Sequence, residues 1–387
     1  MRFIRIILTL FCFLFVHLSN GQENFLTEKF TLPEAIKETS GLVFYNNRVI
    51  THNDSGNQPN LYEIDTLSGN IVRTITLNNV TNVDWEDIAQ DENYIYIADI
   101  GNNNGNRQDL KIYRISKSDY LASNSVNAET ISFTYEDQTD FTSQPNNTNF
   151  DAEAIGITGN NIVIFTKNWI DLHTNAYVIP KTIGTHIAHK ESAYNSQGLI
   201  TGASFDGDRI MLSGYDTTAT PFLVFVSENR PPGFDFFGGD PYRIDLVGTA
   251  FLEQGSQVEA IGYFDLGFKC FITREFSSID VGGTTIEFPQ KLYESTSEIF
   301  SLLSTNDVVL SNQVDIAPNP VENSFQILQK SNPLEIKSIQ LYNLLGKESL
   351  SFKDSEMIDL SNLKNGVYFV RIQFASGQIV VKKIVKE

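Results

Sequence analysis

A short motif recurs five times along this chain, and a repeat of this kind limits the fold more strictly than composition does. Three copies begin with Glu and two with a hydroxyl residue, and their first positions are 46, 67, 48 and 58 residues apart. Each copy is followed by a turn containing Asn, Asp or Gly and then by a continuous apolar stretch, which fits a strand buried on both faces. The first positions are Ser40, Glu86, Glu153, Thr201 and Glu259.

Further strands follow in each repeat, so that most units contain four. Antiparallel units of this size at a spacing of roughly 50 residues predict an all-β fold, a β-propeller of five blades. The last unit lacks a fourth strand, and residues 28–32, which precede the first motif, are expected to supply it. Six blades stay open as an alternative, because residues 121–150 offer room for extra strands.

The two ends of the chain differ from its body. Arg2 and Arg5 precede an apolar run at residues 6–16, and this pattern predicts an export signal over residues 1–21. The run is too short to span a bilayer, and no later apolar stretch approaches the length that a membrane-spanning helix needs. We therefore expect a propeller over residues 22–305, a polar linker at 306–313 and a small C-terminal β-sandwich over 314–387, all outside the cytoplasm.

The C-terminal region carries several motifs in order. They are Ala317-Pro318-Asn319-Pro320, then Leu341-Tyr342-Asn343-Leu344-Leu345-Gly346-Lys347, then Leu363-Lys364-Asn365-Gly366-Val367-Tyr368, and a basic-apolar end at residues 382–386. This region resembles the type A C-terminal sorting domain of the type IX secretion system of Bacteroidetes. The resemblance implies a partner, the secretion machinery, and delivery to the cell surface or the medium after Sec export, with the active part located in the propeller.

The inner strands of a propeller line its central channel, so the five motif positions would face one another there as one axial ring. Three carboxylates placed close together repel unless a cation neutralises them. Oxygen ligands without His or Cys favour Ca²⁺ over zinc or copper. A purely structural role, in which each Glu accepts hydrogen bonds from a neighbouring blade, is the open alternative.

The order Ser, Glu, Glu, Thr, Glu, one residue per blade, also resembles the central calcium site of the calcium-activated nucleotidases, which are five-bladed propellers. The resemblance covers the repeat skeleton and the axial ring, and Thr201 stands where that family has Ser. It implies that Ser40, Glu86, Glu153, Thr201 and Glu259 hold a calcium ion. The rest of that family's pattern is not evident here, so the resemblance says little about catalysis.

A second set of polar residues ends the second strands, 12 to 16 residues after the motif positions, and is expected at one face of the ring. His52, Asp54 and Asp99 are the candidate bases toward water. Candidate substrate contacts are Lys167, Arg274, Tyr215 and Trp169. Solvated strand ends that pair among themselves, and a Trp used for packing, are the structural alternatives.

These residues support two hypotheses of different class. The first is a calcium-dependent hydrolase of a phosphorylated or esterified small molecule, with a sugar-lactone hydrolase on a six-bladed ring as a variant. The second is a surface module that binds a small molecule or glycan without catalysis. The net charge of −19 argues against a nucleic-acid partner.

Overall fold

The structure is a computed structural model of the 387-residue chain. It describes residues 26–226, 233–239, 241–246, 255–265, 269–281, 283–295, 314–330, 333–343, 348–353, 357–375 and 379–387. The expected export signal at residues 1–21 and the expected linker at 306–313 lie outside the described residues. Within the described part, nearly all of the regular secondary structure is β-strand, which confirms the predicted fold class.

The strands form blades in chain order. The first blade contains β2 (Thr39–Tyr45), β3 (Arg48–Asn53), β4 (Asn60–Asp65) and β5 (Ile71–Leu77). The second contains β6 (Trp85–Gln90), β7 (Tyr94–Asp99), β8 (Lys111–Ser116) and β10 (Glu129–Tyr135). The third contains β11 (Ala152–Thr158), β12 (Asn161–Thr166), β13 (Thr174–Pro180) and β14 (Gly184–Tyr194).

The fourth blade contains β15 (Leu199–Asp206), β16 (Arg209–Tyr215), β17 (Pro221–Val226) and β18 (Tyr242–Asp245). The fifth contains β19 (Val258–Asp265), β20 (Lys269–Arg274), β23 (Lys291–Ser295) and β1 (Leu26–Thr31). A hairpin of β21 (Ser277–Val281) and β22 (Thr284–Phe288) extends from this blade between β20 and β23. A short 3₁₀-helix, η1 (Glu34–Ile36), lies between β1 and β2.

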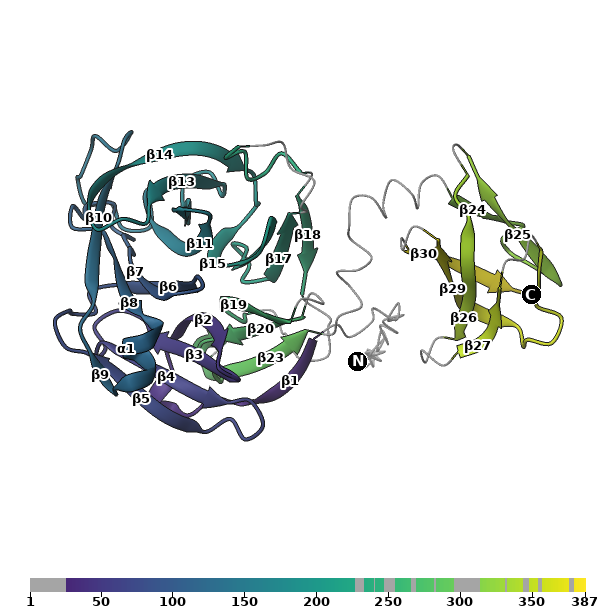
Figure 1. Ribbon diagram of the computed structural model, residues 1–387, viewed down its shortest axis with the longest axis horizontal. Coiled ribbons are helices and arrows are strands. Elements are labelled where there is room, and N and C mark those ends of the chain that lie inside the picture. The colour runs from purple at the N-terminus through teal and green to yellow at the C-terminus, as the bar shows by residue number, and fades with distance from the viewer. Residues whose placement is uncertain are drawn as a thin grey trace, which may run out of the picture.

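The inner strands close into a ring. Strand β2 contacts β6, β6 contacts β11, β11 contacts β15, β15 contacts β19, and β19 contacts β2 again, as Figure 1 shows around the axis. The described residues therefore form five blades. Residues 121–150, which left room for a sixth blade, contain the end of α1 (Lys117–Ala122), the two-residue strand β9 (Ser125–Val126), β10 and a long loop.

The predicted closure by the N-terminal segment is confirmed. Strand β1 is antiparallel to β23 and forms the outer strand of the last blade, with Leu26 opposite Ser295 and Thr31 opposite Lys291. Two parallel pairings also join neighbouring blades at their outer edges, β9 with β5 and β10 with β14. Such pairings occupy edge strands that would otherwise expose unpaired backbone groups.

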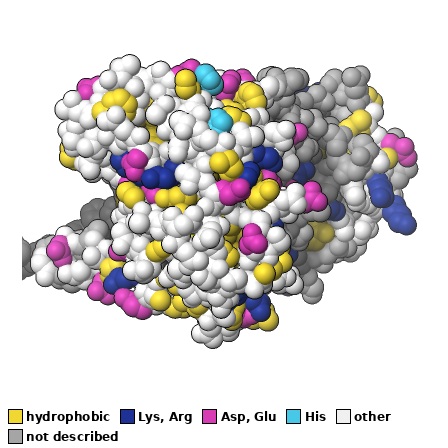
Figure 2. All heavy atoms as spheres, turned by 60° about the vertical axis from the view of Figure 1, so that its left-hand side comes forward, with side chains coloured by type: hydrophobic (Ala, Val, Ile, Leu, Met, Phe, Trp, Pro, Cys, Tyr) yellow, Lys and Arg dark blue, Asp and Glu magenta, His cyan; other side chains and the backbone are white. Residues whose placement is uncertain are grey.

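The core lies between the blades, where the apolar second strands contribute on both faces. Between the second and third blades, for example, Tyr96, Ile112 and Phe133 pack with Ile155 and Tyr177. On the surface view of Figure 2, acidic and basic side chains lie beside one another among uncharged ones, so the negative net charge forms no single patch on that face.

The C-terminal domain is a sandwich of two antiparallel sheets. One contains β24 (Val314–Ala317), β25 (Ser324–Gln329) and β28 (Met357–Asp359). The other contains β26 (Ile336–Asn343), β27 (Glu348–Phe352), β29 (Gly366–Phe374) and β30 (Ile379–Lys386). The alternating residues Tyr368, Val370, Ile372 and Phe374 of β29 are buried between them, as their period of two predicts. Among the described residues, no helix has the length and apolar character needed to cross a membrane.

Candidate functional site

An acidic cavity of about 440 Å³ opens at one end of the central channel. We call it the axial cavity. Six carboxylates and only two cationic side chains line it, together with amides, hydroxyls and two aromatic rings. The charged lining residues are Asp54, Asp84, Glu86, Glu153, Glu259, Glu275, Arg107 and Lys167.

A local irregularity presents the motif residues to this cavity. In four blades the register between the first two strands shifts at the motif position, so that Glu86, Glu153, Thr201 and Glu259 each occupy a β-bulge. In the first blade the shift falls one residue later, at Gly41, whose φ is 65°. A bulge redirects a side chain that regular pairing would place in the sheet. The repeated motif therefore encodes a repeated bulge at the axis.

The two hydroxyl members of the axial ring contact the backbone of the next blade. Ser40 Oγ donates to the carbonyl of Glu86 at 2.6 Å, and Thr201 Oγ1 donates to the carbonyl of Val258 at 2.5 Å. Ser40 still lines the cavity, whereas Thr201 does not. Both hydroxyls thus join neighbouring blades, and the ring predicted from sequence is divided between joining residues and carboxylates.

Glu86 belongs to a tighter group than the ring. One carboxylate oxygen each of Asp54, Asp84 and Glu86 lies within 4.8 Å of the others, close enough to share one metal ion. Glu86 is only 5% exposed, and burial and the negative charges of its neighbours are the main influences on its carboxylate. A Cβ at position 101 would collide with the carboxylates of Glu86 and Asp84, so any larger residue at Gly101 would displace these two side chains.

The electrostatics of this group match its crowding. Burial, helped by the charge of Asp54, raises the pKa of Asp84 to about 7, and the same two causes raise the pKa of Glu86 well above its ordinary value. Burial also raises the pKa of Glu275 to about 7. Because desolvation and like charges both disfavour ionisation here, a bound cation would be strongly stabilising.

Across the cavity, one lysine neutralises part of the negative charge. Lys167 Nζ lies 2.5 Å from Glu153 Oε1, and both side chains are buried. Burial lowers the pKa of Lys167, but the charges of Glu153 and the other surrounding acidic groups together outweigh burial and hold this pKa well above its ordinary value. The rings of Trp169 and Tyr215 lie 5.0 and 5.3 Å from this ammonium. Trp169 Nε1 donates to Asp151 at 2.8 Å, which fixes the indole in the cavity wall.

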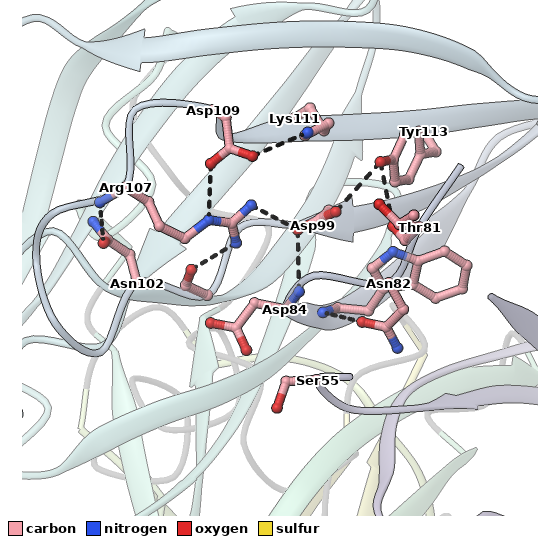
Figure 3. A network of polar contacts seen from close by, with 12 residues as sticks. Ser55, Thr81, Asn82, Asp84, Asp99, Asn102, Arg107, Asp109, Lys111 and Tyr113 are labelled. Atoms are coloured by element: carbon pink, nitrogen blue, oxygen red, sulfur yellow. Dashed lines mark hydrogen bonds and ion pairs between the residues drawn. The ribbon is translucent and has the colours of Figure 1, made fainter. Parts of the chain in front are cut away.

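Three residues predicted for chemistry or substrate binding lie away from the cavity lining. The His52 ring is fully buried against Trp85, and burial lowers its pKa to about 4. Arg274 donates to the carbonyl of Pro289 and to Ser256 Oγ. Asp99 accepts from Arg107 at 2.8 Å and from the backbone of Asp84 (Figure 3). Asp54, Lys167, Tyr215 and Trp169 do line the cavity.

Sequence reasoning missed part of the lining. Asp84 precedes its motif by two residues, and Arg107 comes from the loop after β7, where it joins Asp99, Asp109 and the carbonyl of Gly101 (Figure 3). An acidic residue stands at the same offset in the first and third blades, Glu38 before Ser40 and Asp151 before Glu153, so the repeat carried a signal for Asp84 that the prediction did not use. Arg107 lies in an irregular loop outside the repeated motif. The Asn-rich run at residues 102–106 was the only hint that this loop has a special role.

Comparison with known proteins identifies one domain. Residues 315–387 match the family described as the secretion system C-terminal sorting domain. No curated protein matches the chain. Among solved structures, the extracellular domain of a B. thetaiotaomicron protein described as a one component system is 12% identical, with a TM-score of 0.32 over 91% of this chain. This chain spans 57% of that domain's length.

A second solved structure, the hydrazine synthase of Kuenenia stuttgartiensis, is 10% identical with a TM-score of 0.34, covering 91% of this chain and 97% of that one. TM-scores this low give no basis for assigning an activity. The family match, together with the sandwich that β24 to β30 form, identifies the C-terminal region. Residues 315–387 are a type IX secretion sorting domain, and the protein is exported through that machinery to the cell surface or the extracellular space.

Proposed function

We propose that the propeller is an extracellular, calcium-dependent hydrolase that acts on a phosphorylated or esterified small molecule. The observation that carries the proposal is the group of Asp54, Asp84 and Glu86 in the same cavity as Lys167 and Tyr215. The group offers an ion three carboxylates, and the opposite wall offers a substrate a cation and a hydroxyl.

The donor set fits calcium. All three group members offer carboxylate oxygens, which hard cations such as Ca²⁺ prefer, and no His or Cys lines the cavity among the described residues. Ser40 and Glu259, two members of the predicted ring, add further oxygens to the lining. A bound calcium ion would polarise the substrate oxygen and reduce the repulsion among the carboxylates.

The residues of the chain then divide the remaining work. Lys167 and Tyr215 orient the group to be cleaved, and Trp169 forms the wall beside it. We assign proton transfer to Glu275, because it lines the cavity and burial raises its pKa to about 7, which suits a base and an acid near neutral pH. An attacking water bonds to the carbonyl carbon or phosphorus and gives a proton to Glu275. The bond to the leaving oxygen breaks, and Glu275 returns the proton to that oxygen.

The second candidate is a binding module without catalysis. The observation that favours it is that both cationic residues of the cavity are already paired, Lys167 with Glu153 and Arg107 with Asp99. A strongly charged substrate would therefore have to compete with internal carboxylates for either cation. The two candidates share the calcium ion and differ only in turnover.

Calcium titration by calorimetry, followed by a substrate panel, tests both candidates. We expect one bound Ca²⁺ per chain, and Glu86→Gln should weaken its affinity by about 100-fold, or about 2.7 kcal/mol. Glu34→Gln is the control, because that side chain is 79% exposed on η1 and should leave the affinity unchanged. The panel contains nucleotides, phosphomonoesters, lactones and acyl esters.

Turnover that requires Ca²⁺ and is lost in Glu86→Gln supports the hydrolase. Calcium binding without turnover of any compound supports the binding module. If the wild-type protein binds no Ca²⁺, both candidates are wrong in their shared premise.

A further inference from the structure

A second cavity adjoins the axial cavity. It is a groove of about 330 Å³ on the outer side of the loop at residues 136–151, which we call the lateral groove. Three pairs of consecutive residues divide between the two cavities: Asn104 and Gly105, Asn146 and Asn147, and Trp169 and Ile170. In each pair the first residue lines the axial cavity and the second lines the groove. The two cavities are therefore separated only by a thin rim made of these three segments.

Backbone and side-chain hydrogen bonds hold this rim in place. The backbone N–H groups of Gln144 and Asn146 donate to the backbone carbonyls of Asn104 and Asn103, both at 2.8 Å. The Trp169 amide donates to the carbonyl of Thr148 at 3.0 Å, and Asn149 Nδ2 donates to Asp171 at 2.9 Å. A long irregular loop fixed in this way is typical of a binding surface formed before the ligand arrives.

The charged residues that line the two cavities limit the class of ligand that could occupy both. The axial lining has an excess of four carboxylates over cations when all are ionised, and one calcium ion would remove only half of that excess. The groove has three carboxylates, Asp137, Asp140 and Asp171, against one cation, Lys190. Anionic ligands would be repelled along the whole path, since like charges brought together in a partly buried cavity are costly.

The uncharged lining points the same way. Amide and hydroxyl side chains form much of both walls, and each of these groups can both donate and accept hydrogen bonds. Apolar surface is supplied at the rim by the Trp169 ring and by Ile170, which is 61% exposed. This combination matches a ligand with many hydroxyl groups and apolar C–H faces.

We propose that the axial cavity and the lateral groove together bind an uncharged oligosaccharide chain, with an esterified unit at the axis and further units across the rim in the groove. The identity of the axial unit rests on the proposed function, because it places the ester beside the carboxylate group. Two parts of the proposal do not rest on the proposed function: that the groove binds further sugar units, and that longer chains therefore bind more tightly. Of the two substrate classes proposed above, the charge of the path selects the ester over the phosphate.

The experiment measures binding by calorimetry to the full chain with saturating Ca²⁺. The probes are xylo-, cello- and malto-oligosaccharides of one to six units, with oligogalacturonates of equal length as anionic comparators. For at least one neutral series, we expect the affinity to rise by about tenfold or more between one and four units, or about 1.4 kcal/mol. The anionic series should bind more weakly at every length.

Variants then test whether the groove causes the rise in affinity with chain length. Ile170→Ser and Asn147→Ala should remove most of the gain with length while leaving calcium affinity within about twofold, since both residues line the groove alone. Leu67→Ser is the matched control. Leu67 is 91% exposed in the turn between β4 and β5 of the first blade, and it lines neither cavity. Glu86→Gln should weaken calcium binding by the same factor of about 100 and leave the gain in affinity with chain length in place.

Three results with the wild-type protein would each overturn the proposal: no neutral series binds, the anionic series binds more tightly, or affinity is independent of length. Loss of calcium binding alone would contradict the proposed function and not the groove. A gain with length that survives in Ile170→Ser and Asn147→Ala would also overturn it, because the groove would not be responsible.

Discussion

The two ends of the central channel are formed by the same five strands and differ in almost every property. One end is the axial cavity with its six carboxylates. The other is a cavity of about 320 Å³ lined largely by apolar or small residues of the same strands, among them Leu42, Ile88 and Ile155. The motif bulges lie at the acidic end, and beyond them the inner strands pair regularly except for a second register shift between Tyr263 and Asp265 in the fifth blade. The one-residue shift in each inner strand therefore separates an end lined by carboxylates from an end lined largely by apolar side chains.

The largest expected effect concerns the buried ion pair of the acidic end. Lys167→Met leaves Glu153 buried without its partner and should lower the free energy of unfolding by about 3–5 kcal/mol. Denaturation in the presence of EDTA, followed by tryptophan fluorescence, measures this, since both tryptophans of the chain lie in the propeller.

Lys29→Met is the matched control for that substitution. Lys29 pairs with Glu294 at 2.6 Å, but both side chains are 28% exposed, so about 0–1 kcal/mol should be lost. Equal losses in the two variants would break the comparison, because the acidic end would then hold its charges no more tightly than the surface does.

An intermediate effect is expected from pH. Asp84 and Glu275 have pKa values raised to about 7 by burial, whereas in the unfolded chain they should titrate near pH 4. The folded state therefore binds more protons between these values, and its stability falls as pH rises through about 7. Metal-free protein should melt at a higher temperature at pH 5.5 than at pH 8.

Saturating calcium should reverse this order, because the ion needs ionised carboxylates and binds more tightly at pH 8. Thermal unfolding with EDTA and with calcium, again followed by tryptophan fluorescence, gives both comparisons. A melting temperature of the metal-free protein that rises toward pH 8 would contradict the buried, uncompensated state of these carboxylates.

The smallest effect is expected at the apolar end. Ile157 lines the apolar cavity at the opposite end of the channel from the axial cavity. Ile157→Thr should leave calcium affinity within about twofold, because Ile157 shares no partner with the carboxylate group. Calorimetry under the conditions used for Glu86→Gln measures it. A change of tenfold or more would show that the two ends act as one unit.

The sequence predicted the blades and the axial motif positions, and it missed most contacts made by loops and across blade boundaries. The five motifs predicted the blades, the closure by β1 and the placing of Glu86 and Glu259 at the axis, because each follows from repetition. It did not predict that Ser40 and Thr201 donate to carbonyls of the next blade, since the neighbour across a blade boundary is fixed only by ring closure. Arg107 was missed because it comes from an irregular loop of one blade. Asp84 was missed although Glu38 and Asp151 stand at the same offset before their motifs, because the prediction used only the first motif position.

The pairing of β1 with β23 has a consequence for the order of synthesis. The last blade needs residues from both ends of the propeller, and β23 ends at Ser295, ahead of the sorting domain at residues 315–387. A ribosome that has made the sorting domain has therefore already made every strand the ring requires. A chain truncated before closure lacks the address as well, so an open ring is not presented to the secretion machinery by its own tail.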